Sequence, residues 1–277
     1  MKRIEFSKEE IEKIINLYVN KNIGMAKIGA MFNVSKSVIS RIIKENNITH
    51  RNDNHKYIAD YRKFQYIDTA EKAYWLGFIA ADGCVYKRTD NNAGNFMFIN
   101  IHQKDREHLE KFREFMNSNV NIIDHIQNQG FSNNTPMSKI ILNSNDLVQD
   151  LIDKGIVPRK SLILKPPKID EQFFLPFILG YFDGDGCLSL IEKTHQFELS
   201  FVGTKELLTW INDLLSISNH LGQRHITEKN NYFIKCGGTF KPYNILKILY
   251  DSVSVHLDRK YNKYKTLETV VLSRNTK

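Results

Sequence analysis

One internal repeat restricts the possible folds of this chain more than any other feature of its sequence. Residues 75–83 read WLGFIAADG, residues 178–186 read ILGYFDGDG, and a cysteine follows each segment, which gives an offset of 103. Flanking dipeptides match at an offset of 100, namely residues 118–119 with 218–219, 125–126 with 225–226, and 159–160 with 259–260. A repeat of this length is too long for a solenoid unit. The sequence therefore predicts two related halves that form one pseudo-symmetric body.

Each half shows the same order of expected elements. A helix that ends in Asp-Gly is followed by two strands, a helix, two more strands and a last helix. In the first half, the elements after the motif are expected at residues 84–87, 96–101, 106–116, 122–127, 139–142 and 145–154. In the second half, they are expected at residues 187–191, 197–201, 205–215, 225–227, 232–236 and 243–251. Apolar side chains alternate with polar ones along residues 96–101 and 197–201, so each of these strands has one buried face.

The repeated segments carry small residues at a helical spacing. These residues lie four positions apart in each segment: Gly77 and Ala81, then Gly180 and Gly184. Small side chains one turn apart let two helix backbones approach closely. We therefore expect the two motif helices to pack against each other along these residues.

Asp82 and Asp185 lie in the last turns of the expected motif helices, each followed by a glycine. A carboxylate there opposes the helix macrodipole and costs about 0.3–1 kcal/mol. The glycines are expected in the left-handed conformation that ends many helices. If the helices pack side by side, the two carboxylates meet and need a cation between them, and their hard oxygen ligands suit Mg²⁺. The plainer alternative is that each aspartate only forms an Asx-type turn.

Positive charge is concentrated at the start of the chain. Residues 1–66 hold 13 basic and 7 acidic side chains, and they carry most of the net charge of +8. Such a concentration attracts polyanions, of which nucleic acid is the commonest. The rest of the composition is ordinary for a globular protein.

Helical spacing in this basic region indicates three short helices. Ser7 with Glu10 forms a capping box before the first helix, and residues 25–32 form the second, with Ile28, Met31 and Phe32 inward. A tight turn at residues 33–34 leads to a third helix capped by Ser35, the order of a helix-turn-helix.

The third helix presents short hydroxyls and long cations on one face, which suit base edges and phosphates. This DNA-binding face consists of Ser35, Lys36, Ser37, Ser40, Arg41 and Lys44. The alternative is a three-helix bundle with a solvated basic face. The expected domains are a helix-turn-helix domain at 1–50, a basic linker at 51–66, and repeats at 67–167 and 168–277.

The doubled motif resembles the signature of LAGLIDADG homing endonucleases in their single-chain form. The resemblance rests on the two nonamers and their flanks, including residues 73–74 and 157–160, and it covers about residues 67–277. It implies an α+β fold of two αββαββα repeats that form a DNA-binding saddle, with the motif helices as central interface. It also implies that Asp82 and Asp185 bind Mg²⁺ or another divalent cation such as Mn²⁺.

The resemblance implies further catalytic residues. A lysine of each half is expected near the scissile phosphates, and Lys160 and Lys260 match, 78 residues after Asp82 and 75 after Asp185. They are alternatively phosphate clamps or solvated helix-cap lysines. Gln103, just after the second strand, resembles the polar position that organises water.

Base edges would be read by the polar faces of the strands: Asn100 and His102 in the first half, Gln196, Glu198 and Ser200 in the second. The halves also depart from each other. Ala80 in the first motif corresponds to Asp183 in the second, and Gly203 stands where a counterpart of Gln103 is expected. The two half-sites are therefore expected to be chemically unequal.

The implied activity is that of a site-specific endonuclease that makes metal-dependent double-strand cuts at a long, asymmetric DNA site. The chain is expected to act as a monomer on double-stranded DNA, in the cytoplasm (nucleoid-associated in a bacterial or phage-infected cell) or in an organelle. Two alternatives on the same scaffold stay open: a non-catalytic DNA-binding regulator and an RNA-splicing maturase.

Other classes of protein are disfavoured. The longest apolar runs, residues 73–81 and 173–182, are far shorter than the roughly 20 residues of a membrane span, so no membrane partner is expected. The charged N-terminus lacks the apolar core of a signal peptide. Three scattered cysteines are too few for a disulfide framework or a zinc knuckle.

Overall fold

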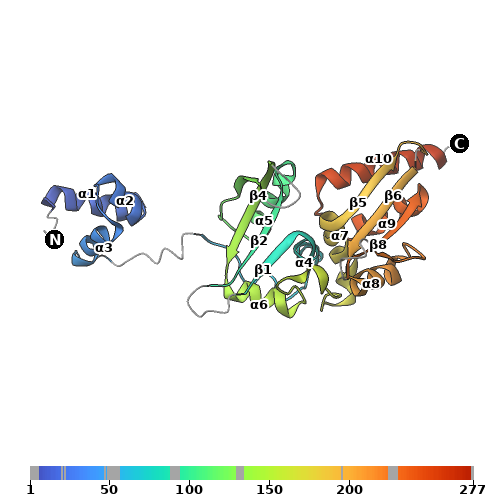
Figure 1. Cartoon of the computed structure of the whole chain (residues 1–277), viewed down its shortest axis with the longest axis horizontal. Coiled ribbons are helices and arrows are strands. Elements are labelled where there is room, and N and C mark those ends of the chain that lie inside the picture. Colours follow the sequence, from blue (N-terminus) through green and yellow to red (C-terminus); the bar gives the residue numbers. More distant parts are fainter. Residues whose placement is uncertain are drawn as a thin grey trace. The chain divides into compact units, whose positions relative to one another are not determined.

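The structure is a computed structural model that describes residues 6–19, 21, 23–46, 48, 57–87, 94–128, 134–194, 196–223 and 230–275. The chain divides into two compact units, residues 1–56 and 57–277 (Figure 1). Each unit has its own hydrophobic core. The expected strand at 225–227 and the first part of the expected linker, residues 51–56, lie outside the described residues. None of the helices described is both long and apolar enough to cross a membrane.

In its described residues, the first unit contains α1 (Lys8–Val19), α2 (Met25–Met31) and α3 (Lys36–Glu45). The expected capping box at its start is confirmed. The Ser7 amide donates to Glu10 Oε2 at 2.8 Å, and the Glu10 amide donates to Ser7 Oγ at 3.2 Å. Isoleucines at helical spacing supply most of the small core, since the fully buried side chains here include Ile14, Ile28, Ile39 and Ile43.

The turn between α2 and α3 depends on two residues. Asn33 has a φ of 57°, in the left-handed region that asparagine tolerates. A Cβ at Gly29 would lie 2.6 Å from the Val34 carbonyl oxygen, so a side chain there would block the turn. One expectation was wrong in detail, because Met31 is 59% exposed at the end of its helix. Ser35 is the N-cap residue of α3 as expected, but its Oγ bonds Ser37 Oγ at 2.7 Å and makes no capping hydrogen bond.

The first repeat begins with the motif helix and contains one antiparallel sheet in the order β1-β2-β4-β3. Its elements are α4 (Ala70–Asp82), β1 (Gly83–Tyr86), β2 (Phe96–His102), η2 (Gln103–Asp105), α5 (Arg106–Phe115), β3 (Ile123–Gln127), β4 (Thr135–Asn143), α6 (Asn145–Asp153) and η3 (Lys160–Leu162). The predicted order of elements is confirmed in this repeat.

The second repeat has the same topology, with a sheet in the order β5-β6-β8-β7. Its elements are η4 (Glu171–Phe173), α7 (Phe174–Asp185), β5 (Gly186–Ile191), β6 (Gln196–Gly203), α8 (Lys205–Leu215), β7 (Gly222–Gln223), β8 (Tyr232–Gly238), α9 (Phe240–Asp251) and α10 (Asp258–Asn275). The 18-residue helix α10 was not expected from the sequence.

The motif helices α4 and α7 pack side by side between the two sheets (Figure 1). Each sheet turns one face to the helices, as the alternation predicts. In β2 the buried side chains are Met97, Ile99 and Ile101, and in β6 they are Phe197, Leu199 and Phe201. The opposite faces of both sheets carry side chains that are not needed for the core.

The two motif helices meet backbone to backbone. A Cβ built on Gly77 would lie 2.0 Å from the carbonyl oxygen of Phe177, and one built on Gly180 would lie 1.9 Å from that of Tyr74. A Cβ on Gly184 would lie 2.2 Å from the Cβ of Ala81. No real Cβ approaches so closely, so these positions require glycine for the helices to pack at this distance.

The glycines that follow the motif aspartates are not in the expected left-handed conformation. Gly83 and Gly186 have φ values of −78° and −85° and continue directly into β1 and β5. Glycine is required at these two positions for a different reason. A Cβ would lie 2.7 Å from the carbonyl oxygen of Ile79 at Gly83 and 2.6 Å from that of Phe182 at Gly186.

Candidate functional site

Asp82 and Asp185 are the last residues of α4 and α7, so the packing of these helices brings them to one end of the central interface. Asp82 Oδ2 lies 3.3 Å from the point where Gly184 would carry a Cβ, so it touches the partner helix. Burial and the charge of Asp185 raise the pKa of Asp82 to about 6. Two carboxylates that disfavour each other's charge form a site prepared for a cation.

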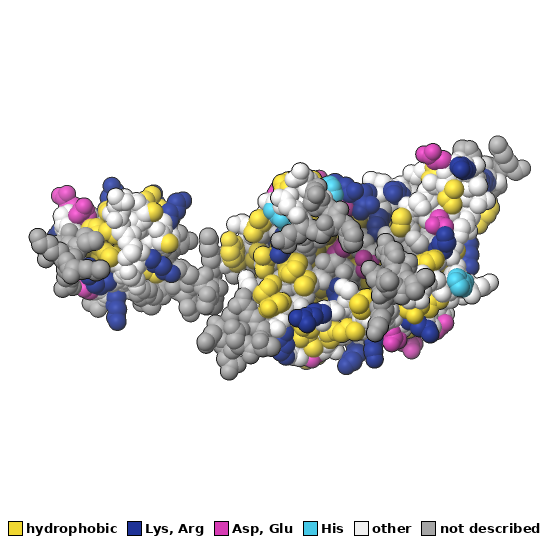
Figure 2. Space-filling model, viewed as in Figure 1, with side chains coloured by type: hydrophobic (Ala, Val, Ile, Leu, Met, Phe, Trp, Pro, Cys, Tyr) yellow, Lys and Arg dark blue, Asp and Glu magenta, His cyan; other side chains and the backbone are white. Residues whose placement is uncertain are grey.

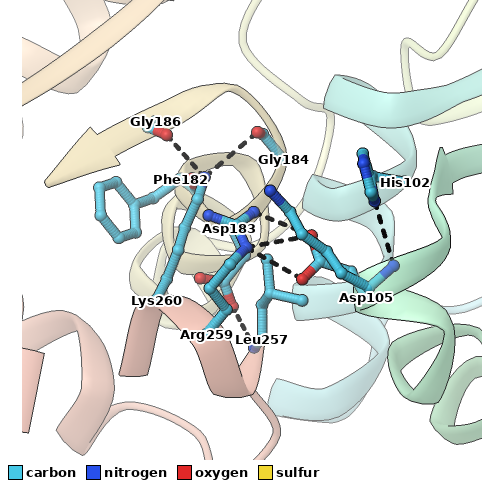
Figure 3. Close-up of polar contacts among 10 residues, drawn as sticks. His102, Asp105, Phe182, Asp183, Gly184, Gly186, Leu257, Arg259 and Lys260 are labelled. Carbon is cyan, nitrogen blue, oxygen red and sulfur yellow. Dashed lines mark hydrogen bonds and ion pairs between the residues drawn. The ribbon is translucent and has the colours of Figure 1, made fainter. Parts of the chain in front are cut away.

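Lys160 and Lys260 are buried near these carboxylates, with 7% and 5% of their surfaces exposed. Lys160 Nζ donates to the Ala81 carbonyl at 2.9 Å. Lys260 Nζ donates to three carbonyls, those of Phe182 and Gly186 at 2.6 Å and that of Gly184 at 3.2 Å (Figure 3). The lysines therefore donate to carbonyls in the last turns of α4 and α7 and at the start of β5, where intrahelical donors run out.

Both lysines interact electrostatically with the carboxylates in addition to their hydrogen bonds with backbone carbonyls. Burial lowers the pKa of each, while neighbouring carboxylates act in the opposite direction: Asp185 and Asp82 on Lys160, and Asp183 foremost on Lys260. Their ammonium groups offset the helix dipole and the carboxylates together. The bonds to carbonyls at the helix ends are those of helix-cap lysines, which was one of the alternatives. These lysines are buried at the site, however, and not solvated.

Two cavities among the described residues flank the helix ends, and each contains one of the two aspartates. A cavity of about 270 Å³ is lined by Asp82 together with polar residues that include Asn100, His102, Lys104 and Arg259. A second, of about 210 Å³, is lined by Asp185 together with Lys160, Tyr181, Gly203 and Thr204 among others. The candidate site therefore has two related but unequal halves, one beside each aspartate.

The end of β2 contributes different residues from the one expected. Gln103 is exposed, hydrogen-bonds to Asp124 and is not among the residues that line the cavity of Asp82. Its neighbours His102 and Lys104 line it instead, and His102 Nδ1 accepts a hydrogen bond from the Lys104 amide at 3.1 Å (Figure 3). Gln103 begins the 3₁₀ turn η2 and bonds Asp124 of β3, so it is not among the residues that the structure gathers around Asp82.

The strand pairing also corrects the expected counterpart of Gln103. Gly83 pairs with Ile99 in the first sheet, and Gly186 pairs with Phe201 in the second. The offset along these strands is thus 102, so Gly203 corresponds to Ile101 and not to Gln103. His102 then corresponds to Thr204, and both line their cavities.

Arg259 and Asp105 were missed by the sequence reasoning. Arg259 Nε donates to Asp105 Oδ1 at 2.9 Å and Oδ2 at 3.2 Å, and Nη2 donates to Oδ2 at 2.9 Å (Figure 3). This pair joins the start of α10 in the second repeat to the start of α5 in the first. The repeated dipeptide at 159–160 and 259–260 was the available signal, but it does not reveal which acid the arginine meets.

Asp183 explains the first difference between the motifs. It is buried in α7, accepts the hydroxyl of Tyr74 at 2.6 Å and the amide of Leu257 at 2.7 Å, and burial raises its pKa to about 6. Asp183 therefore ties α7 to α4 and to the chain before α10. Ala80, at the same place in the first motif, makes no such connection because methyl groups form no hydrogen bonds.

The expected base-reading residues of the strands lie on the sheet faces opposite the core. Asn100 and His102 are on this face of β2, and Asn100 Nδ2 donates to Gln127 Oε1 at 3.2 Å. Gln196, Glu198 and Ser200 are on the matching face of β6, where Lys235 Nζ donates to Glu198 Oε2 at 2.8 Å.

The expected DNA-binding face of α3 lies in the first unit, which is described by itself. Ser35, Lys36, Ser37 and Lys44 are exposed, while Ser40 and Arg41 are half-buried. Arg41 lies 3.9 Å from Glu45 one turn later. These side chains share the helix surface opposite Ile39, Ile42 and Ile43.

A resident metal cluster of the usual protein type is not seen among the residues that the structure describes, where no group of three or more His, Cys, Asp or Glu side chains converges. Two carboxylates nevertheless fit Mg²⁺, which is commonly held by one or two carboxylates plus water and substrate phosphate oxygens. The raised pKa of Asp82 beside Asp185 is the observation that favours a cation here.

A known family model matches the first repeat, and a solved structure is similar to the fold of both repeats. Residues 69–153 match the family model described as LAGLIDADG-like domain. Among solved structures, the chain is similar to I-GzeII, a LAGLIDADG homing endonuclease in complex with its DNA target, with a TM-score of 0.51 and 11% identity over 74% of this chain and 91% of that one. No curated protein matches the sequence.

Two further solved structures have lower scores. I-LtrWI, a LAGLIDADG homing endonuclease bound to target DNA, gives a TM-score of 0.48 and 13% identity over 78% of this chain and 92% of that one. The LAGLIDADG meganuclease I-AabMI, bound to uncleaved DNA, gives 0.47 and 13% over 73% and 91%. The likeness to I-GzeII shows the fold, and the family model matches the first copy of the motif. Residues 69–153 thus hold a LAGLIDADG-like domain, and the chain repeats the motif of that domain at residues 178–186 on this fold.

Proposed function

We propose that this chain is a site-specific DNA endonuclease that cuts both strands of a long, asymmetric duplex in a reaction that depends on a divalent metal. The observation that carries the proposal is the meeting of Asp82 and Asp185 at the end of the paired helices α4 and α7. The two carboxylates lie between two sheets whose outward faces carry polar side chains. I-GzeII, which shares the fold, was solved with its DNA target, and this supports duplex DNA as the substrate.

The chemistry assigned to the residues follows from their charge and burial. Asp82 and Asp185 would hold Mg²⁺ or a similar cation, which supplies Lewis acidity and an activated water. Lys160 and Lys260 hold fixed positive charges beside the carboxylates, where they stabilise the negative charge that develops on the phosphate. Lys104, which is exposed and lines the cavity of Asp82, would hold a backbone phosphate.

Specificity would come from the outward faces of the two sheets and from the first unit. Antiparallel strands that carry polar side chains fit the major groove, whose base edges present distinct donor and acceptor patterns. Helix α3 would add contacts to flanking DNA through Lys36 and Lys44, and the covalent connection raises its effective concentration there. Because the two sheets carry different residues, we expect the preferred site to be non-palindromic and the chain to act as a monomer.

Incubation of the full chain with a library of randomised duplexes tests the proposal. In Mg²⁺ we expect one non-palindromic sequence to be cut on both strands, and in excess EDTA we expect the same sequence to be bound without cleavage. A chain that binds a duplex but never cuts it would be a regulator. A chain that ignores duplex DNA and binds a folded intron RNA would be a maturase, and either outcome refutes the endonuclease.

A further inference from the structure

Three aromatic side chains form a row on the outward face of the first sheet. Tyr86 of β1 pairs with Phe96 of β2, and their rings are stacked with centroids 5.0 Å apart and planes at 23°. The ring of Phe98 continues the row, 6.3 Å from that of Phe96 at 24°. Figure 2 shows hydrophobic side chains gathered over β1 and β2. We call Tyr86, Phe96 and Phe98 the aromatic row.

The aromatic row does not belong to the core. The neighbours Met97 and Ile99 point the other way and are fully buried, whereas Tyr86 is 50% exposed. Ile141 of β4 lies opposite Phe98 in the strand pairing and is half-buried, which widens the apolar surface. A contiguous apolar patch on an outward face indicates a binding surface.

This surface continues directly from the candidate site. Asn100 and His102, which line the cavity of Asp82, lie on the same face of β2 as Phe98 and Phe96. Two residues advance a strand by about 7 Å, and successive base pairs are about 3.4 Å apart. On DNA held at the carboxylates, Phe98 would therefore lie about two base pairs beyond Asn100, and Phe96 about four.

Charge around the aromatic row favours DNA over a protein partner. Strands β1, β2 and β4 contain no acidic residue. Lys139 Nζ lies 3.8 Å from the centroid of the Phe98 ring, and Lys87 follows Tyr86 directly. The lysines would attract the phosphates of a polyanion, and the aromatic row would contact apolar groups in its groove. In the DNA major groove that group is the C5 methyl of thymine.

The second sheet has no such row at the matching positions. The strand pairings align Tyr86 with Ser189, Phe96 with Glu198, and Phe98 with Ser200. Glu198 also pairs with Lys235 across the strands. The polar counterparts would read hydrogen-bonding base edges and offer no apolar contact to a methyl group. The two halves of the protein therefore differ in the chemistry they present to DNA.

From this difference we infer that the first repeat recognises thymine methyl groups, so that the half-site under the aromatic row is thymine-rich and the other half-site is not. This inference rests on the proposed function, because the aromatic row meets a groove only if DNA lies across the sheets. Within that function it names the bases and the residues that select them.

Replacement of thymine by deoxyuridine tests the inference, because it removes the methyl group and keeps every hydrogen bond of the base pair. The full chain would be titrated with its library-selected duplex carrying deoxyuridine in one half-site or in the other. We expect one half to be sensitive, with a loss of about fourfold in affinity for each methyl contacted. The other half should tolerate the replacement.

The matched variants are Tyr86→Ser and Phe98→Ser, which install the residues of the second repeat on an exposed surface. Circular dichroism would show that they keep the fold. We expect both to bind the thymine duplex more weakly and to lose most of the difference between thymine and deoxyuridine. The control Ser200→Ala should keep that difference.

The possible results separate the two claims. If the chain binds no duplex, the proposed function fails and this inference fails with it. If it binds and cuts a site that lacks thymine in both halves, or binds thymine and deoxyuridine duplexes equally, the endonuclease stands and the methyl readout is refuted. A difference that survives in both serine variants refutes the role of the aromatic row.

Discussion

Gly77 lies so close to Phe177 that a Cβ on the glycine would be 2.0 Å from the phenylalanine carbonyl oxygen. This contact joins the two motif helices, and neither backbone can yield without moving a whole helix. We therefore expect Gly77→Ala to lower the free energy of unfolding by about 3 kcal/mol, at the upper end of overpacking effects. Urea unfolding measures it. Gly94→Ala is the control, since nothing lies within 4 Å of that position, and equal stability of the two variants would contradict the close packing.

Lys160 and Lys260, the buried lysines near the carboxylates, should contribute unequally to the stability of the fold. Lys260 donates to three carbonyls and Lys160 to one. Lys260→Met removes three of these hydrogen bonds and Lys160→Met removes one, so we expect losses of about 3 kcal/mol and about 1–2 kcal/mol of stability. Urea unfolding of the two variants measures both values. A larger loss for Lys160→Met would show that the carbonyl contacts do not govern stability here.

His108 makes the stability of the fold depend on pH. It is buried against Trp75 and Phe78, its Nε2 lies 3.0 Å from the Tyr74 hydroxyl, and burial lowers its pKa to about 3. The unfolded chain therefore takes up a proton near pH 6.5 that the folded chain does not, and stability falls as the pH drops below that value. The contribution of His108 at pH 5 is a loss of about 2 kcal/mol.

Buried carboxyls act in the other direction, so the effect of His108 is measured by difference. The pKa values of Asp82 and Asp183 are raised to about 6, and the folded state gains relative stability as these groups protonate below that pH. Between pH 7.5 and pH 5, His108→Gln should lose about 2 kcal/mol less stability than the wild type. Equal losses in the two proteins would mean that His108 is protonated in the folded state.

Helix α3 should affect the salt dependence of DNA binding. Lys36 and Lys44 are exposed on the helix face opposite the core. If both contact phosphates, the double variant Lys36→Ala, Lys44→Ala should reduce the slope of log affinity against log salt by about 1.8. Lys247→Ala, which removes an exposed lysine paired with Asp251, is the control. An unchanged slope would show that this helix face does not touch DNA.

Much of the fold was predictable because its signals are local and repeated. The alternation along β2 and β6, the capping box at Ser7 and the doubled nonamer each specify one element without knowledge of the rest. Helix α10 was not predicted because, apart from Lys260, its buried residues are few: Tyr264, Leu267 and Val271 lie on one face of a largely exposed helix. Such a weak apolar pattern does not stand out from a polar tail.

The candidate site was predictable in its residue types more than in its geometry. The placement of Asp82 and Asp185 follows from helix packing, which the small residues signal. The position of the Gln103 side chain depends on η2, a single 3₁₀ turn for which the sequence carries no clear signal. The Arg259–Asp105 pair joins residues 154 positions apart, and only the assembled repeats bring them together.

The central claim is that one active site takes an acid from each repeat. The most direct test compares cleavage of a selected duplex in Mg²⁺ by the wild type, Asp82→Asn and Asp185→Asn, with both strands labelled and binding measured in parallel. We expect the wild type to cut both strands. Either variant should lose at least about a hundredfold in rate, equivalent to about 2.7 kcal/mol in the barrier, while it binds the duplex with little change. Cleavage at the wild-type rate by either variant would contradict the account.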